Sequence, residues 1–172
     1  MQHEDLTALK IFHGLKQEDA TSICESLGTL QYNANDTILN EGESVQALWI
    51  ILRGQCNVSR LCSKNGRRVL ATLNAGDVFG EMSFVRTAPH SASIVAMTDV
   101  KVCAYRREDF LELVSHRPEA AWQISSNIAA VLAERLRRMD TWVCDLFESP
   151  EGKDHGDEWK SFRSAVYTNW NF

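Results

Sequence analysis

The segment of this sequence best suited to chemistry is residues 76–84, which read GDVFGEMSF. Within it a Gly-Glu pair, Gly80 and Glu81, stands between a strand-like run and what could be one turn of helix. Glycine lets a backbone approach a ligand closely, and N–H groups at the start of a helix can bind phosphate. The Glu81 carboxylate would repel a phosphate but accepts hydrogen bonds well, so it suits a nearby sugar hydroxyl. The pair therefore fits a ligand that carries a phosphate and a sugar, with a plain turn as the alternative.

Residue patterns for catalysis or metal binding are missing from the sequence. No G-x-S-x-G, H-E-x-x-H or Walker loop occurs. The five cysteines form no C-x-x-C pair and have no histidines at zinc-finger spacing, so we expect neither a disulfide framework nor a metal site. We therefore expect a protein that is not an enzyme and requires no cofactor. The cysteines are Cys24, Cys56, Cys62, Cys103 and Cys144.

Composition limits the chain to one domain with an appendage. It has 172 residues, of which 44% are hydrophobic and 24% are charged, enough apolar side chains to bury a core. The net charge of -5 argues against binding along nucleic acid or an anionic membrane, since such binding needs clustered positive charge. The N-terminus carries acids where a signal peptide needs bases, and no apolar run approaches the roughly 20 residues of a membrane span. We expect a cytoplasmic protein with reduced thiols and no membrane contact.

Short β-branched and aromatic runs between about residues 29 and 106 predict strands, and each run ends at residues typical of turns. The pair Asn65-Gly66 suits the two-residue turn of a hairpin that joins strands 55–63 and 67–73. Several short strands at this spacing indicate an antiparallel barrel or sandwich. The other clear runs are residues 47–52, 69–73, 91–96 and 100–105.

Helical spacing of apolar residues occurs on both sides of this strand region. Residues 6–27 predict two short helices that break near His13-Gly14, and residues 108–115 predict another. After Pro118 an apolar stripe predicts one helix from residue 119 to about 147, roughly 40 Å long at 1.5 Å per residue. Part of that stripe extends beyond what one small barrel can cover, which indicates a homodimer; the alternative is a helix that folds back on its own domain. The residues expected nearest the seam are Leu132, Leu136, Met139 and Val143.

The C-terminal residues 148–172 read as a separate acidic linker and aromatic-rich segment after a domain of residues 1–147. One helical face of this segment carries aromatic and apolar residues, which predicts packing on the domain or, as the alternative, binding of another protein. These residues are Trp159, Phe162, Val166 and Trp170. Only about 25 residues follow Phe147, too few for a helix-turn-helix, so we expect no DNA binding.

Residues 76–96, GDVFGEMSFVRTAPHSASIVA, resemble the phosphate-binding cassette of cyclic nucleotide-binding domains. The glycine-punctuated residues 40–58 resemble the first strands of that family, and residues 101–110 and 118–147 resemble its last strand and lid helices. The resemblance covers about residues 5–147. It implies an α+β fold: an eight-stranded antiparallel, jelly-roll-like β-roll with N-terminal helices and a long C-terminal lid and dimerisation helix.

The same resemblance implies the roles of individual residues around cAMP or cGMP. Gly80 and the N–H groups of Met82 and Ser83 would line the cyclic phosphate, and Glu81 would accept a hydrogen bond from the ribose 2′-OH. Ser91 would offer a hydroxyl to the phosphate or base. The remaining implied contacts are Leu70 and Ala71 along the pocket, and Asp140 and Thr141 on the lid helix above the base.

One residue departs from the family pattern: His90 stands where the family has an arginine that pairs with the phosphate. A neutral histidine offers one N–H, whereas arginine offers a permanent charge and a fork of donors. Losing a charged hydrogen bond costs about 1.5–3 kcal/mol, or roughly ten- to a hundredfold in affinity. If a protonated His90 partners the phosphate, affinity rises as pH falls from about 8 to about 6. Arg86, earlier in the same loop, could supply the charge from another direction.

Two functional hypotheses follow from the sequence. The first is a non-enzymatic sensor in which a cyclic mononucleotide orders the cassette and reseats the lid helix. The second is a protein-interaction and dimerisation module that keeps the fold but no longer binds nucleotide, because His90 has replaced the arginine. Calorimetric titration with cAMP and cGMP distinguishes them.

Overall fold

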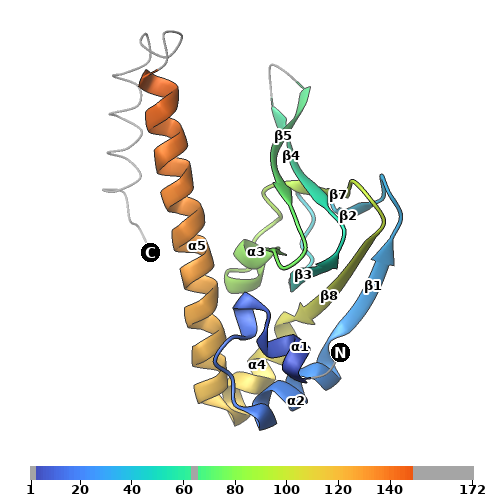
Figure 1. The fold of residues 1–172 in the computed structure, drawn as a ribbon, viewed down its shortest axis with the longest axis vertical. Coiled ribbons are helices and arrows are strands. Elements are labelled where there is room, and N and C mark those ends of the chain that lie inside the picture. The colour runs from blue at the N-terminus through green and yellow to red at the C-terminus, as the bar shows by residue number, and fades with distance from the viewer. Residues whose placement is uncertain (1–2, 63–65, 149–172) are drawn as a thin grey trace. The chain divides into compact units, whose positions relative to one another are not determined.

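The predicted strands form two antiparallel sheets, which place the Gly-Glu segment at a junction between a strand and a helix (Figure 1). The computed structural model describes residues 3–62 and 66–148. Asn65 and the aromatic stripe of residues 159–170 lie outside the described residues, so the predicted packing of that stripe stays a prediction.

Within the described residues there are eight strands in two four-stranded sheets, one in the order β1-β8-β3-β6 and the other in the order β2-β7-β4-β5. Every pair of neighbouring strands is antiparallel. This confirms the predicted β-roll. The strands are β1 (Gly28–Tyr32), β2 (Thr37–Leu39), β3 (Ala47–Arg53), β4 (Cys56–Cys62), β5 (Gly66–Leu73), β6 (Val78–Phe79), β7 (Ser93–Ala96) and β8 (Val100–Arg106).

The central strand β3 is buried on both of its faces, which explains why its sequence is continuously apolar rather than alternating. Trp49 and Ile51 belong to the core cluster shared by both sheets, while Leu48 and Ile50 point to the other face and are fully buried as well. On that face Tyr105 of β8 meets aromatic rings from three helical elements. Its ring centroid lies 5.9 Å from Phe12, 6.2 Å from Phe84 and 6.4 Å from Phe110. Helices therefore cover one sheet, and aromatic contacts attach them to β8.

The hairpin β4-β5 is present as predicted, but the predicted two-residue turn is wrong, because Gly66 is the first residue of β5 and lies opposite Cys62. Gly66 has φ 68°, in the left-handed region that favours glycine. Strand β5 is an edge strand, exposed along its whole length except at Leu73. One prediction needs correction: the strand expected from residue 91 begins at Ser93. The reason is that His90 bonds to an upstream turn instead, since its N–H donates to the Glu43 carbonyl at 2.8 Å and its carbonyl accepts from Gly42 at 2.9 Å.

Of the two predicted N-terminal helices, α2 (Gln17–Ser26) confirms the second, whereas the first is divided into α1 (His3–Thr7) and a short 3-10 turn, η1 (Lys10–Phe12). They are joined to the start of the long helix by polar contacts. The Asn127 amide donates to the carbonyls of Ile11 and His13, both at 2.9 Å. The buried Asp19 accepts from Arg117 at 2.7 Å.

Two further helices follow the strands, α4 (Arg107–His116) and α5 (Pro118–Glu148), close to the predicted bounds. By its internal contacts the chain divides into two compact units, residues 1–128 and 129–172, so α5 begins in the first unit and ends in the second. The predicted domain boundary after residue 147 stays a prediction. Among the described residues no helix is both long enough and apolar enough to span a bilayer.

Candidate functional site

Gly80 occupies a position that only glycine can fill without strain. It lies between β6 and the one-turn helix α3 (Glu81–Val85) and caps that helix with φ 79° and ψ 2°, a left-handed conformation. A Cβ atom at this position would lie 2.7 Å from the Ala47 carbonyl oxygen and 2.9 Å from Cδ1 of Trp49. The sheet therefore presses directly against the backbone at the point where the cassette turns into α3.

Helix α3 is held in place by the side chains on its inner face. Glu81, Ser83 and Phe84 are buried, and the Phe84 ring lies 5.2 Å from that of Phe110. In the first turn of any helix the N–H groups have no helical carbonyl as acceptor, and here those groups belong to Glu81, Met82 and Ser83. At the other end, Arg107 donates to the Phe84 carbonyl and, at 3.2 Å, to the Val85 carbonyl, a favourable place for a positive charge.

His90 is buried beneath the cassette rather than presented to solvent, with 7% of its surface exposed. Its Nδ1 lies 3.1 Å from Oγ of Ser83. The Ser83 hydroxyl donates to the Gly80 carbonyl at 3.0 Å. Burial lowers the pKa of His90 below its ordinary value of 6.5, against the opposing effects of the Glu43 carboxylate and the Val45 backbone. At neutral pH the ring is therefore mainly uncharged.

Two buried polar atoms near this turn have no hydrogen-bond partner among the described residues: Nε2 of His90 and Nε1 of Trp49. The Trp49 nitrogen would lie 3.6 Å from a Cβ atom on Gly80. Buried polar groups are normally satisfied, and an unsatisfied one costs about 1–3 kcal/mol. The surroundings of Gly80 and His90 therefore fit a ligand that carries polar groups.

The other predicted site residues of the first unit lie at the surface. Ser91 is exposed, and its hydroxyl donates to the Met82 sulfur at 3.7 Å, which links the two ends of the cassette loop. Leu70 and Ala71 are exposed on β5, and the Met82 side chain is 59% exposed. Apolar side chains in these positions are available to a ligand.

The predicted lid residues Asp140 and Thr141 lie on the part of α5 that belongs to the second unit. Their contact with a ligand stays a prediction. Arg86, considered as a substitute cation, is exposed and follows the last residue of α3. It lies at the helix end opposite to the N–H groups of Met82 and Ser83.

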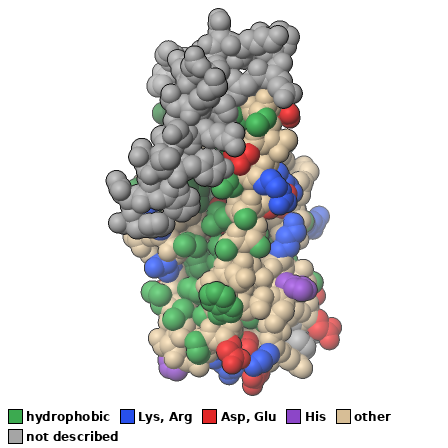
Figure 2. Space-filling model, turned by 90° about the vertical axis from the view of Figure 1, so that its left-hand side faces the viewer, with side chains coloured by type: hydrophobic (Ala, Val, Ile, Leu, Met, Phe, Trp, Pro, Cys, Tyr) green, Lys and Arg blue, Asp and Glu red, His purple; other side chains and the backbone are tan. Residues whose placement is uncertain are grey.

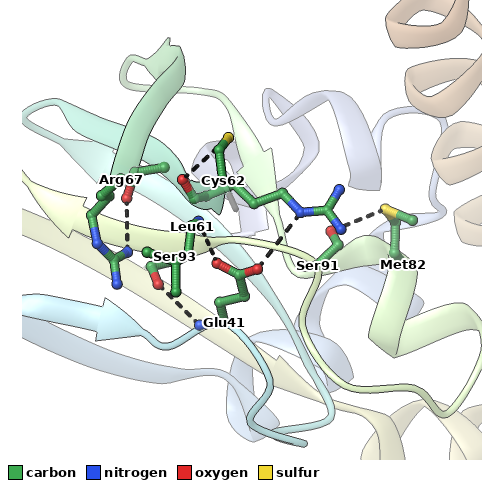
Figure 3. A network of polar contacts seen from close by, with 9 residues as sticks. Glu41, Leu61, Cys62, Arg67, Met82, Ser91 and Ser93 are labelled. Carbon is green, nitrogen blue, oxygen red and sulfur yellow. Dashed lines mark hydrogen bonds and ion pairs between the residues drawn. The ribbon is translucent and has the colours of Figure 1, made fainter. Parts of the chain in front are cut away.

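Sequence reasoning missed a polar network around Glu41, which Figure 3 shows. The Glu41 carboxylate accepts from the Leu61 N–H at 2.9 Å and lies 3.6 Å from Nε of Arg60. The Glu41 N–H donates to the buried Ser93 hydroxyl at 3.0 Å. No pattern in the sequence marks this network, because its residues come from segments that only the pairing of β4 with β7 brings together; in that pairing Ser59 lies opposite Ser93.

Comparison with known proteins agrees with this geometry. A family model described as "Cyclic nucleotide-binding domain" matches residues 29–117. The "Cyclic AMP receptor protein" of Thermus thermophilus is 35% identical over 144 residues, 84% of this chain and 64% of that protein. The "cAMP-dependent protein kinase regulatory subunit" of Debaryomyces hansenii is 30% identical over 115 residues, 66% of this chain and 25% of that protein. The crystal structure of a cyclic nucleotide-binding domain from Methylobacillus flagellatus superimposes with a TM-score of 0.72 at 25% identity, covering 80% of this chain and 77% of that one.

The two antiparallel sheets with their flanking helices thus define a β-roll fold. The chain belongs to the cyclic nucleotide-binding domain family, which confirms the resemblance. It spans 64% of the length of the Thermus relative and a quarter of the kinase regulatory subunit.

Proposed function

We propose that this chain is a non-enzymatic sensor that binds cAMP or cGMP in the cassette and signals through α5. The observation that carries the proposal is the left-handed Gly80 wedged against Ala47 and Trp49, followed at once by the buried Glu81. This arrangement holds the start of α3 against β3, so the N–H groups of its first turn keep a fixed position. The names of the two relatives, both tied to cyclic AMP, support cAMP as the first ligand to test.

In this proposal the cyclic phosphate lies against Gly80 and the N–H groups of Met82 and Ser83, because the first turn of α3 leaves donors there. The Glu81 carboxylate accepts a hydrogen bond from the ribose 2′-OH, and Ser91 supplies a hydroxyl. Leu70 and Ala71 form the apolar wall of the pocket, and the contact of the lid residues Asp140 and Thr141 with the base stays a prediction.

Signalling requires that α5 responds to the ligand, and its exposed apolar side chains indicate how. Trp122 is 74% exposed, Leu136 44%, Met139 47% and Trp142 63%. Figure 2 shows hydrophobic side chains exposed on one face of the molecule. We propose that this helix pairs with the same helix of a second copy, and that nucleotide binding changes how the pair is seated.

The test is calorimetric titration of the full chain with cAMP, cGMP and, as a ligand without the phosphate ring, 5′-AMP. We expect binding of a cyclic nucleotide, and a loss of roughly ten- to a hundredfold in affinity for Glu81→Gln. The matched control is Glu108→Gln, which changes a carboxylate on α4 whose side chain is 72% exposed. Thermal unfolding of each variant without ligand verifies that the fold is intact. No binding of either cyclic nucleotide at millimolar concentration would refute the sensor and leave the interaction module.

A further inference from the structure

The cassette needs a positive charge that position 90 does not supply. A cyclic nucleotide phosphate carries a negative charge, and the turn that bonds to His90 and Ser93 carries the carboxylates of Glu41 and Glu43. The His90 ring is buried, is bonded to Ser83 and is mainly uncharged at neutral pH. An anion placed beside carboxylates without a nearby cation would bind weakly. A cation from another element must therefore serve the site if the site binds a phosphate.

We propose that Arg60 of β4 is this cation, and that it exchanges the Glu41 carboxylate for the cyclic phosphate when nucleotide binds. This inference rests on the proposed function above. It assigns a ligand-binding role to a residue outside the cassette and a competing role to Glu41.

The contacts of Glu41 place the Arg60 charge at the edge of the cassette. Nε of Arg60 lies 3.6 Å from the Glu41 carboxylate, and Glu41 is bonded through its own N–H to Ser93 at 3.0 Å. The next residues of the same turn bond to His90, with Gly42 donating to its carbonyl at 2.9 Å. In Figure 3 the dashed line of the ion pair leaves Glu41 on the side of Ser91 and Met82. The guanidinium is therefore held by the turn that is itself bonded to the end of the cassette.

The ion pair between Arg60 and Glu41 is weak enough for a phosphate to replace the Glu41 carboxylate as the partner of Arg60. The Arg60 side chain is 59% exposed, and exposed ion pairs contribute about 0–1 kcal/mol, so little is lost when Arg60 leaves Glu41. Hydrogen bonds to a charged phosphate are stronger, and a guanidinium can form two of them in parallel. The Glu41 carboxylate stays in place after the exchange because its other oxygen accepts from Leu61 at 2.9 Å.

Two other arginines, Arg67 and Arg86, are less well placed for this role. Arg67 donates to the Ser59 hydroxyl at 3.2 Å, and Figure 3 shows it on the far side of Glu41 from Ser91 and Met82. Arg86 follows the C-terminal end of α3, whereas the N–H groups proposed to bind phosphate are at its start. Of these three arginines, Arg60 is the one whose position and weak ion pair both fit the exchange.

The experiment is titration of cAMP and cGMP into the parent, Arg60→Gln, Arg60→Lys, Glu41→Gln and the double variant, at about pH 8, where His90 is uncharged. We expect Arg60→Gln to weaken binding roughly ten- to a hundredfold and Arg60→Lys to restore part of the loss. Glu41→Gln keeps an acceptor for Leu61 but removes the competing charge, so it should strengthen binding by up to about fivefold. In the double variant this gain should vanish. The matched control is Arg106→Gln, an exposed arginine that pairs with Glu108 at 3.1 Å.

A purely structural role for the ion pair predicts that Arg60→Gln and Glu41→Gln weaken binding alike, and that result would overturn the inference. If the parent binds nucleotide and Arg60→Gln and Arg106→Gln bind it with the same affinity as each other, the role of Arg60 is overturned and the proposed function stands. No binding by the parent would overturn both. Unchanged unfolding midpoints without ligand verify that the affinities report on the site.

Discussion

Substitution of Gly80 tests whether the cassette depends on the close approach of the sheet. Gly80→Ala places a Cβ atom 2.7 Å from the Ala47 carbonyl oxygen and 2.9 Å from Trp49, at a residue with φ 79°. Neither neighbour is a flexible side-chain end, since one is backbone and the other is a ring in the core. The substitution should therefore distort the turn, destabilise the first unit and weaken nucleotide binding together.

The magnitude can be divided between two effects. An L-residue other than glycine in the left-handed region costs roughly 1–2 kcal/mol. Forcing an extra methyl group into a packed site costs a further 1–3 kcal/mol or so. Alanine also restricts the unfolded chain, which returns about 0.4–1 kcal/mol. We expect Gly80→Ala to lower the free energy of unfolding by about 2–4 kcal/mol.

The control is Gly76→Ala, which has nearly the same backbone conformation, φ 87°, but no atom within 4 Å of the added Cβ. It carries the backbone and unfolded-state effects without the collision, so the difference between the two variants measures the collision alone. Urea unfolding followed by far-UV circular dichroism gives both free energies. Equal destabilisation by Gly80→Ala and Gly76→Ala would refute the view that the sheet presses on Gly80.

Two further outcomes follow from the structure. Because burial lowers the pKa of His90 below 6.5, the unfolded chain binds a proton first as pH falls. The contribution of His90 to the free energy of unfolding should therefore be complete above pH 6.5 and decline below it. Urea unfolding of the parent and of His90→Gln across this pH range measures that contribution. An NMR titration midpoint for His90 above 6.5 would contradict the expectation. Leu136→Glu should make a dimeric parent monomeric in sedimentation velocity, since it buries an unpaired charge in the proposed seam. The control Asp145→Lys changes a charge nine residues further along α5, on the opposite face of the helix, and should leave the sedimentation coefficient unchanged. A parent protein that is monomeric at tens of micromolar would rule out the seam.

The residue patterns alone predicted an antiparallel barrel or sandwich, because their evidence is local, and the resemblance to a known family narrowed this prediction to the β-roll. The β-branched and aromatic runs, the turn residues and the Gly-Glu pair each report on a few neighbouring residues, and steric limits on the backbone make such patterns informative. The start of α5 at Pro118 and the break at His13-Gly14 were also predictable for this reason. The start of β7 was not, because the bonds between His90 and residues 42–43 compete with the strand, and they join segments that are far apart in the chain.

The electrostatics of the site were decided only by the tertiary structure. From the sequence, His90 could be a protonated partner of the phosphate, whereas its burial against Ser83 makes it an uncharged part of the cassette. The pairing of Arg60 with Glu41, 19 residues earlier in the chain, follows from the approach of β4 to β7 and has no local signature in either segment. Propensity and spacing act between residues near in sequence, but charge and burial act through space. The identity of the fold could therefore be predicted from the sequence, and the identity of the cation at its site could not.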